Sequence, residues 1–266
     1  MISATERTAN YAVLLVFTLF ALWPIGTVLG AALGPDDAGG VGGLANFAAA
    51  WEQGRFGPSM LTSVAVSGFV VVVAGVLSVL AGYAFGTMRV PGAPVLFPLF
   101  LLGLMVPGEV IVVPLYFDLR TFGLTNTFWA IALPQVAQSV AFGTFWMRAY
   151  FRSQPASLIE AGRLDGAGTW RILWRILVPP ARPAIVTMVV LTYLWTWNEF
   201  LIPLVMATDQ ALRTAPLGLA FFQGQYTSGF TLLAAGAVIV AAPVLIVYLF
   251  LQRHFIRGML EGAVRE

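Results

Sequence analysis

Residues 155–183 read PASLIEAGRLDGAGTWRILWRILVPPARP, a polar, arginine-bearing stretch between two strongly apolar parts of the chain. Small residues and prolines divide it into two short segments, and each carries apolar residues at helical spacing. The pattern predicts a hairpin of two short amphipathic helices. Because charge is costly to bury in lipid, a hairpin of this kind between apolar segments must face water. The surface that it contacts there decides the function.

The sequence on both sides of this hairpin is apolar enough to lie in a bilayer. Hydrophobic residues make up 59% of the chain, and the mean hydropathy is +0.87. Charged residues make up 10%, whereas ordinary globular domains carry about 25%. Helices of about 20 apolar residues can cross the hydrocarbon core and satisfy their own backbone hydrogen bonds. We predict an all-α membrane protein with one transmembrane domain over residues 1–266 and six transmembrane helices, at 11–33, 60–87, 95–119, 127–147, 184–207 and 230–251.

The distribution of arginine predicts the orientation of the chain. All 14 basic residues counted as Lys or Arg are arginine, because the sequence has no lysine. If the amino terminus is cytoplasmic, only Arg55, Arg120 and Arg213 fall in outer loops. Since positive residues concentrate in cytoplasmic loops, we predict that both termini and the 155–183 hairpin are cytoplasmic. The arginines are divided among several loops, which argues against the single basic patch of a nucleic-acid-binding protein.

The residue types that the sequence lacks exclude several kinds of active site. A P-loop requires a lysine that reaches the nucleotide phosphates, and this chain has none. With one histidine (His254) and no cysteine, the usual zinc sites cannot be assembled, and without a second histidine we expect no catalytic triad. We therefore expect the chain not to be an enzyme on its own and to bind no cofactor or metal.

The first helix of the hairpin is predicted from its end signals. Ser157 followed by Glu160 has the spacing of a capping box, which places the start of the helix near Leu158. Gly166 and then Gly168 end it, because glycine accepts the left-handed backbone found after helix C-termini.

The second helix is predicted over residues 170–178, with Thr169 as its cap and Pro179 and Pro180 as its end. An amphipathic helix in such a hairpin can enter a groove of a partner protein. It can equally rest on lipid headgroups. These physical arguments alone leave both alternatives open.

The motif EAGRLDGA at 160–167, followed by ILVP at 176–179 and by Pro183, resembles the EAA loop of binding-protein-dependent ABC importer permeases. Two positions depart modestly from the family pattern: Gly162 replaces a second alanine, and Val178 stands before Pro179. Four further motifs resemble the carbohydrate-uptake, maltose-G-like branch: MVPGE at 105–109, WTWNEF at 195–200, LRTAPLGL at 212–219 and QRHFIRG at 252–258.

The resemblance implies a type I ABC importer permease fold in which the hairpin is a coupling helix that docks on a cytoplasmic ATPase subunit. It implies as partners a second homologous permease subunit, two ATPase subunits that carry ATP and Mg²⁺, and an extracytoplasmic substrate-binding protein. The implied substrate is a sugar such as trehalose, a maltodextrin or a glycerol phosphate derivative. The residues implied to couple to the ATPase are Leu158, Glu160, Ala161, Gly162, Arg163, Asp165, Gly166, Ala167 and Gly168.

Two alternatives of another class are a self-contained, ion-coupled secondary transporter or channel and a structural membrane anchor. Few acidic residues lie within the spans, and no inverted repeat relates the two halves, which argues against the first.

Four polar or aromatic residues within or beside the spans are candidates for a substrate pathway. An acidic residue in a membrane segment usually faces a cavity or a partner, which selects Glu109 and Glu199. Trp197 and Asn198 precede Glu199, and an aromatic ring beside amide and carboxyl groups suits a sugar. The alternative is that Asn198 and Glu199 hydrogen-bond to a neighbouring helix as structural contacts. For Glu109, stabilising a kinked helix or the outer gate is the favoured role.

Overall fold

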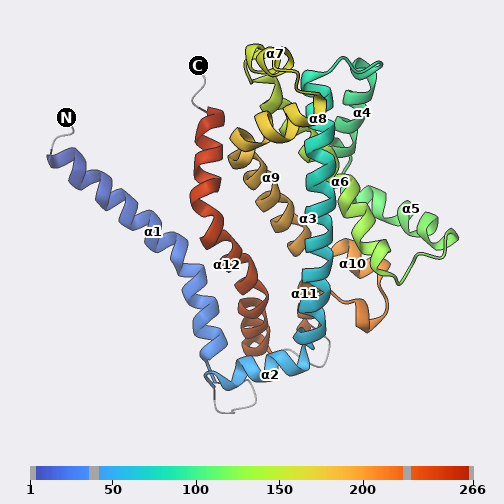
Figure 1. Cartoon of the computed structure of the whole chain (residues 1–266). Helices are drawn as coiled ribbons and strands as arrows, with labels where there is room; N and C mark the ends of the chain where they lie inside the picture. Colours follow the sequence, from blue (N-terminus) through green and yellow to red (C-terminus); the bar gives the residue numbers. More distant parts are fainter. Residues whose placement is uncertain (1–3, 36–41, 224–228, 264–266) are drawn as a thin grey trace. The chain divides into compact units, whose positions relative to one another are not determined.

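The computed structural model describes residues 4–35, 42–223 and 229–263, and these form helices and short connections with no strand among them (Figure 1). The all-α fold predicted from composition is confirmed. The main helices are α1 (Ala4–Leu33), α2 (Ala45–Gln53), α3 (Phe56–Thr87), α4 (Ala93–Met105), α5 (Gly108–Thr121), α6 (Phe128–Arg152), α7 (Ala156–Leu164), α9 (Val178–Asn198), α10 (Leu201–Met206) and α12 (Phe230–Ala263). Short helical pieces join them: α8 (Thr169–Arg171), the π-helix η1 (Ile172–Leu177), the 3-10 helices η2 (Gln210–Leu212) and η3 (Leu219–Gln223), and α11 (Ala215–Gly218).

Each predicted span falls on helical structure, but two of the spans are interrupted. Four helical segments within the described residues are long and apolar enough to cross a membrane, at 5–33, 56–87, 169–198 and 230–252. The span predicted at 95–119 is instead the pair α4 and α5, bent by 100°. The remaining span, α6, has 25 residues and carries several glutamine, serine and threonine side chains among its apolar ones. The span predicted at 184–207 ends earlier, at Asn198.

The break between α4 and α5 has a local cause in the sequence. Pro107 has no backbone N–H to donate, and the residue before a proline is disfavoured in helical conformation. Val106 accordingly adopts an extended backbone, with φ −78° and ψ 122°, and α5 begins after Pro107. The interior prolines Pro98 and Pro114 do not end their helices. The chain therefore turns sharply at Pro107.

Contacts divide the chain into two compact parts, residues 1–57 with 218–243 and residues 58–217 with 244–266. In the first part, Asn46 of α2 donates hydrogen bonds of 2.9 Å to the carbonyls of Ala32 and Gly34, which fixes the connection after α1. Phe56 is fully buried and stacks against Phe222, with ring centroids 6.3 Å apart. The apolar side chains along most of α1 are exposed.

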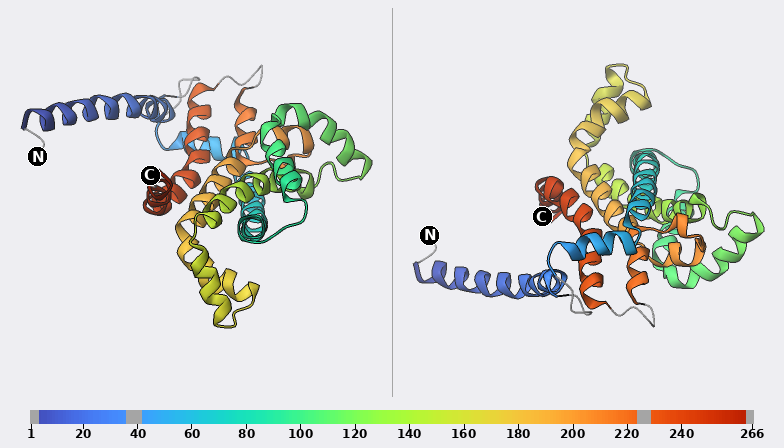
Figure 2. Two further views of the ribbon diagram at one scale, coloured as in Figure 1. Left: turned by 90° about the horizontal axis from the view of Figure 1, so that it is seen from above. Right: turned by 90° about the horizontal axis from the view of Figure 1, so that it is seen from below.

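The second part carries the hairpin, and both views in Figure 2 show α7 projecting from the rest of this part. Its helices α3 and α6 cross closely at Gly82 and Gly143. A Cβ at Gly82 would collide with Met147 Cβ and lie 2.9 Å from the backbone nitrogen of Arg148. A Cβ at Gly143 would collide with Ser78. Glycine is thus required at this crossing because the backbones approach too closely for a side chain.

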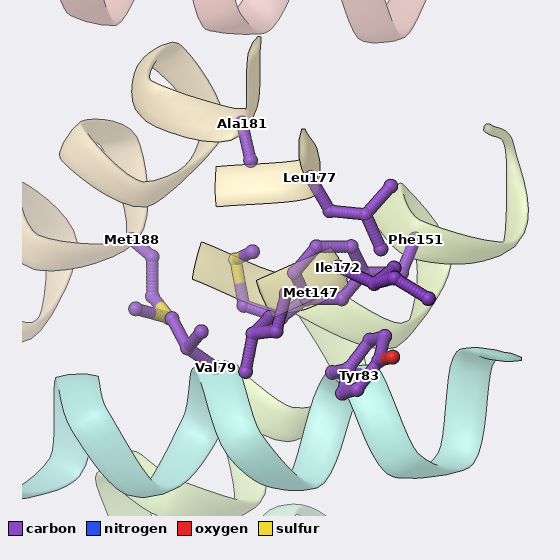
Figure 3. Close-up of a cluster of buried hydrophobic side chains, with 9 residues drawn as sticks. Val79, Tyr83, Met147, Phe151, Ile172, Leu177, Ala181 and Met188 are labelled. Atoms are coloured by element: carbon purple, nitrogen blue, oxygen red, sulfur yellow. The ribbon is translucent and has the colours of Figure 1, made fainter. Parts of the chain in front are cut away.

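Beside this crossing, a cluster of buried side chains joins the base of the hairpin to the spans (Figure 3). Val79 and Tyr83 come from α3, and Met147 and Phe151 come from α6. The remaining members come from η1 and α9: Ile172, Leu173, Leu177, Ala181 and Met188. Because most of these side chains are fully buried, the chain segment that follows the hairpin is anchored in the bundle.

Candidate functional site

The hairpin begins two residues earlier than predicted. Helix α7 starts at Ala156 with Pro155 as its N-cap, and no side chain caps it. The predicted capping box of Ser157 and Glu160 is therefore wrong. Pro155 has φ −59° and ψ 130°, so the proline ring fixes the extended entry, and Ser157 already lies in the first turn.

The end of α7 follows the prediction and has a closed geometry. Gly166 has a φ of +72°, a conformation that glycine adopts without strain. Its N–H donates to the carbonyl of Arg163 at 3.0 Å, and the N–H of Ala167 donates to the carbonyl of Gly162 at 2.9 Å. These two bonds make a Schellman motif after Asp165, the C-cap. The tip of the hairpin is thereby fixed by the backbone.

The second half of the hairpin differs from the prediction. Instead of a helix that ends at Pro179 and Pro180, residues 169–198 form one continuous helical segment that runs into α9. The prolines lie at the start of α9, directly after the six-residue π-helix η1. Proline is tolerated in a first helical turn, and the wider π turn before it relieves the loss of regular hydrogen bonds. Thr169 makes no side-chain cap.

Among the predicted coupling residues, Gly162 is buried and Ala167 is half-buried, and the others are exposed. Gly162 is buried, and a Cβ there would lie 2.6 Å from Ile176 Cδ1 and 3.5 Å from Ile172 Cγ1. Helix α7 thus packs on η1 through Gly162. Ala167 is half-buried, whereas the remaining members are exposed: Leu158, Glu160, Ala161, Arg163, Asp165, Gly166 and Gly168. Their role in coupling stays a prediction.

The close packing of Gly162 predicts that alanine is tolerated there and that leucine lowers the stability of the protein. In Gly162→Ala, the new methyl meets only the end of the Ile176 side chain, and alanine favours the helix by about 1 kcal/mol, so stability should stay within about 1 kcal/mol of the parent. In Gly162→Leu, overpacking should cost about 1–3 kcal/mol and part α7 from η1. The rate of trypsin cleavage at Arg163 in inside-out vesicles measures this separation, and we expect faster cleavage of Gly162→Leu than of the parent. Equal cleavage rates for the two would contradict the prediction.

The four candidate substrate-pathway residues do not lie together. Trp197 is only 1% exposed and packs against Tyr193, with ring centroids 5.6 Å apart. Glu109 is exposed in the first turn of α5. Asn198 and Glu199 do line a common cavity of about 420 Å³.

The other residues of this cavity come mainly from α6. Gln135, Gln138 and Ser139 share one face of that helix, at positions i, i+3 and i+4. The sequence reasoning missed them, although this polar spacing within an apolar helix was the available signal. It also selected the wrong aromatic residue for the cavity, since Trp195 lines it and Trp197 does not. The lining is completed by Leu104, Phe142 and Thr196.

The hydrogen bonds of Asn198 and Glu199 are local. Asn198 Nδ2 donates to the carbonyl of Leu194 at 2.7 Å, within its own helix. Glu199 Oε1 accepts from the backbone N–H of Ile202 at 3.0 Å, at the start of α10. Among the described residues, neither side chain bonds to a distant helix, so the predicted alternative of structural contacts across helices is not observed there.

Comparison with known proteins places these features in a family. The family described as "Binding-protein-dependent transport system inner membrane component" matches residues 78–261. The chain is 36% identical over 220 residues to the probable ABC transporter permease protein YurM of Bacillus subtilis, covering 83% of this chain and 73% of the relative. It is 30% identical over 260 residues to the trehalose transport system permease protein SugB of Mycobacterium tuberculosis, covering 96% and 93%.

A solved structure shares the fold. A chain from the crystal structure of a bacterial ABC transporter involved in the import of the acidic polysaccharide alginate superposes with a TM-score of 0.77 at 24% identity, covering 96% of this chain and 99% of that one. The resemblance inferred from the EAGRLDGA motif is confirmed. The chain therefore belongs to the family of binding-protein-dependent transport system inner membrane components, as a multi-pass protein of the cytoplasmic membrane.

Proposed function

We propose that this chain is a non-catalytic permease subunit of an ABC importer for a sugar or oligosaccharide, and that α7 is its contact with an ATPase subunit. One observation carries the coupling role. The exposed helix α7 is closed by a Schellman motif and packed through Gly162 on η1, which continues into α9. A rigid, solvent-exposed helix joined directly to a membrane span suits a partner that pushes and pulls on it.

The path from hairpin to cavity follows from this continuity. Helix α9 has 21 residues, which gives it a length of about 30 Å. Its start is held in the buried cluster by Leu177 and Ala181, and its other end carries Trp195 and Asn198 on the cavity. A displacement of α7 is therefore transmitted along one helix to the cavity. The chain's role is coupling between two sites and needs no chemistry of its own.

The proposed partners of this chain are inferred from its missing P-loop and from the proteins that it resembles. Without a lysine it has no P-loop, so ATP and Mg²⁺ belong on two partner ATPase subunits. We further propose a second, homologous permease subunit, an extracytoplasmic binding protein, and cytoplasmic termini. Relatives named for diacetylchitobiose uptake, arabinooligosaccharide transport and trehalose transport support a carbohydrate substrate.

Reconstitution in lipid vesicles tests this function. The chain is assembled with its genomic-neighbour permease and ATPase subunits, and ATP hydrolysis is measured with and without sugar-loaded binding protein. We expect the loaded protein to stimulate hydrolysis several-fold and to drive sugar uptake. Uptake by the isolated chain under an ion gradient would instead indicate a secondary transporter. Hydrolysis that is insensitive to the loaded binding protein would indicate a structural anchor.

A further inference from the structure

The cavity of about 420 Å³ between α4, α6 and α9 has the composition of a ligand site. Its volume lies in the range of roughly 300–1,000 Å³ found for small-molecule sites. Amide and hydroxyl groups of Gln135, Gln138 and Ser139 line the cavity from one face of α6, and Asn198 adds a further amide. Such groups donate and accept hydrogen bonds and carry no charge, which suits the hydroxyl groups of a saccharide.

One amide of this cavity is incompletely satisfied. Gln135 is 4% exposed, and its Nε2 donates to the carbonyl of Ile131 at 2.9 Å. Its Oε1 is buried and has no hydrogen-bond partner among the described residues. Because an unpaired buried polar atom is unfavourable, a turn of the Gln135 side chain that brings this oxygen to a ligand hydroxyl in the cavity gains a hydrogen bond.

An aromatic face is available beside these groups. Trp195 lines the cavity and is 52% exposed. Phe142 packs edge-on against it, with ring centroids 4.7 Å apart and an interplanar angle of 71°. This contact fixes the indole plane and leaves a broad apolar surface on which a sugar ring can stack.

The charge of the lining distinguishes between classes of saccharide. Glu199 is the one charged residue among the nine that line the cavity, and none of the nine is basic. Its carboxylate accepts one hydrogen bond, from Ile202 N, and no cation offsets its charge in the lining. An anionic ligand would therefore meet repulsion and find no arginine to pair with, whereas a neutral ligand would meet neither problem.

We propose that this subunit itself contacts the transported saccharide in this cavity, and that the cavity selects an uncharged saccharide over uronates and sugar phosphates. The proposal rests on the proposed function and deepens it. It assigns recognition to Gln135, Gln138, Ser139 and Trp195, with Glu199 as the group that excludes anions.

A single introduced cysteine tests the charge of the cavity directly. The chain has no cysteine, so Leu104→Cys places its one thiol at an exposed position of the lining, at a residue with no assigned role in recognition. In the assembled transporter without ATP or binding protein, the thiol is modified by a trimethylammonium-bearing or a sulfonate-bearing methanethiosulfonate, and labelling of this chain is followed by mass. We compare the rate of modification by the cationic reagent with the rate by the anionic one. We expect this ratio to be at least about fivefold higher than the ratio for a small thiol free in solution.

Adding Glu199→Gln should bring the ratio of the cationic to the anionic modification rate within about twofold of the ratio for the free thiol. The amide oxygen of glutamine can still accept from Ile202 N, so the start of α10 keeps this hydrogen bond while the charge is removed. Thr62→Cys, on α3 outside the cavity, is the control, and its reagent preference should not respond to Glu199→Gln.

Protection by sugars tests recognition. An excess of a neutral disaccharide from the set trehalose, maltose and diacetylchitobiose should slow modification of Leu104→Cys several-fold, and glucuronate should not. The proposal is overturned if Glu199→Gln leaves the ratio of the two modification rates unchanged. It is also overturned if no neutral sugar slows modification of the thiol, or if glucuronate slows it as much as a neutral sugar does. None of these measurements requires ATP hydrolysis. The test of the proposed function can therefore fail while the cavity assignment stands, and the cavity assignment can fail while the proposed function stands.

Discussion

Replacing Glu160 with alanine is expected to lower sugar uptake at least about tenfold while the transporter still assembles and hydrolyses ATP. Glu160 is exposed on α7, and its side chain has no hydrogen-bonded or ionic partner among the described residues. Its removal therefore leaves the hairpin intact and deletes only what it contacts on the ATPase subunit. A central charged contact at a protein interface is commonly worth 2 kcal/mol or more, which corresponds to at least about a tenfold effect.

The measurement is uptake of labelled sugar and ATP hydrolysis in the same vesicles, with the amount of each subunit determined in parallel. Ser157→Ala is the matched control, since it is an equally exposed truncation on the same helix outside the predicted coupling set. Gly166→Ala should also reduce uptake, because a left-handed backbone costs a non-glycine residue about 1–2 kcal/mol and loosens the Schellman motif. Unchanged uptake by both Glu160→Ala and Gly166→Ala would remove the basis for coupling through α7.

Replacing Gly82 with alanine is expected to destabilise the bundle by at least about 1–3 kcal/mol, through overpacking at the crossing of α3 and α6. The new methyl would collide with Met147 Cβ and lie 2.9 Å from the backbone nitrogen of Arg148, so no rotation of a side chain relieves it. The two helices must separate. Because Met147 belongs to the buried cluster at the base of the hairpin, the separation also loosens the anchor of η1 and α9.

Gly68 provides a control on the same helix. A Cβ at Gly68 has nothing within 4 Å, so Gly68→Ala adds helix propensity without a clash and should be neutral or slightly stabilising. Thermal unfolding of the purified transporter should give a Tm lower by several degrees for Gly82→Ala and an unchanged or higher Tm for Gly68→Ala. Equal Tm values for the two variants would show that the close approach at Gly82 is absent.

The local end signals of the hairpin were predicted with uneven success. Gly166 ends α7 as expected, because the left-handed backbone after a helix is a local property of glycine. The capping box at Ser157 was wrong because Pro155 already sets an extended entry two residues earlier. Pro179 and Pro180 were expected to end a helix, yet they start α9, since the preceding π turn lets the helical path continue.

The composition of the cavity could not be predicted from one segment. Trp197 and Trp195 both lie in WTWNEF, and their positions two residues apart place them on different sides of a helix. Only the packing of α9 against its neighbours determines that Trp197 is buried and that Trp195 faces the cavity. Glu199 was selected correctly for the cavity lining, but Glu109 lies apart from it.

The sequence by itself determined the membrane class, the helical content, the position of the hairpin and the family. Each of these depends on hydropathy, on backbone preferences of glycine and proline, or on a contiguous motif, and such signals are local. The tertiary structure alone decided the close crossing at Gly82, the inward packing of Gly162 and the lining of the cavity. These features depend on which faces of distant helices meet. Close packing between distant helices sets their energy, and the sequence of one segment does not show which side chains of another helix it will contact.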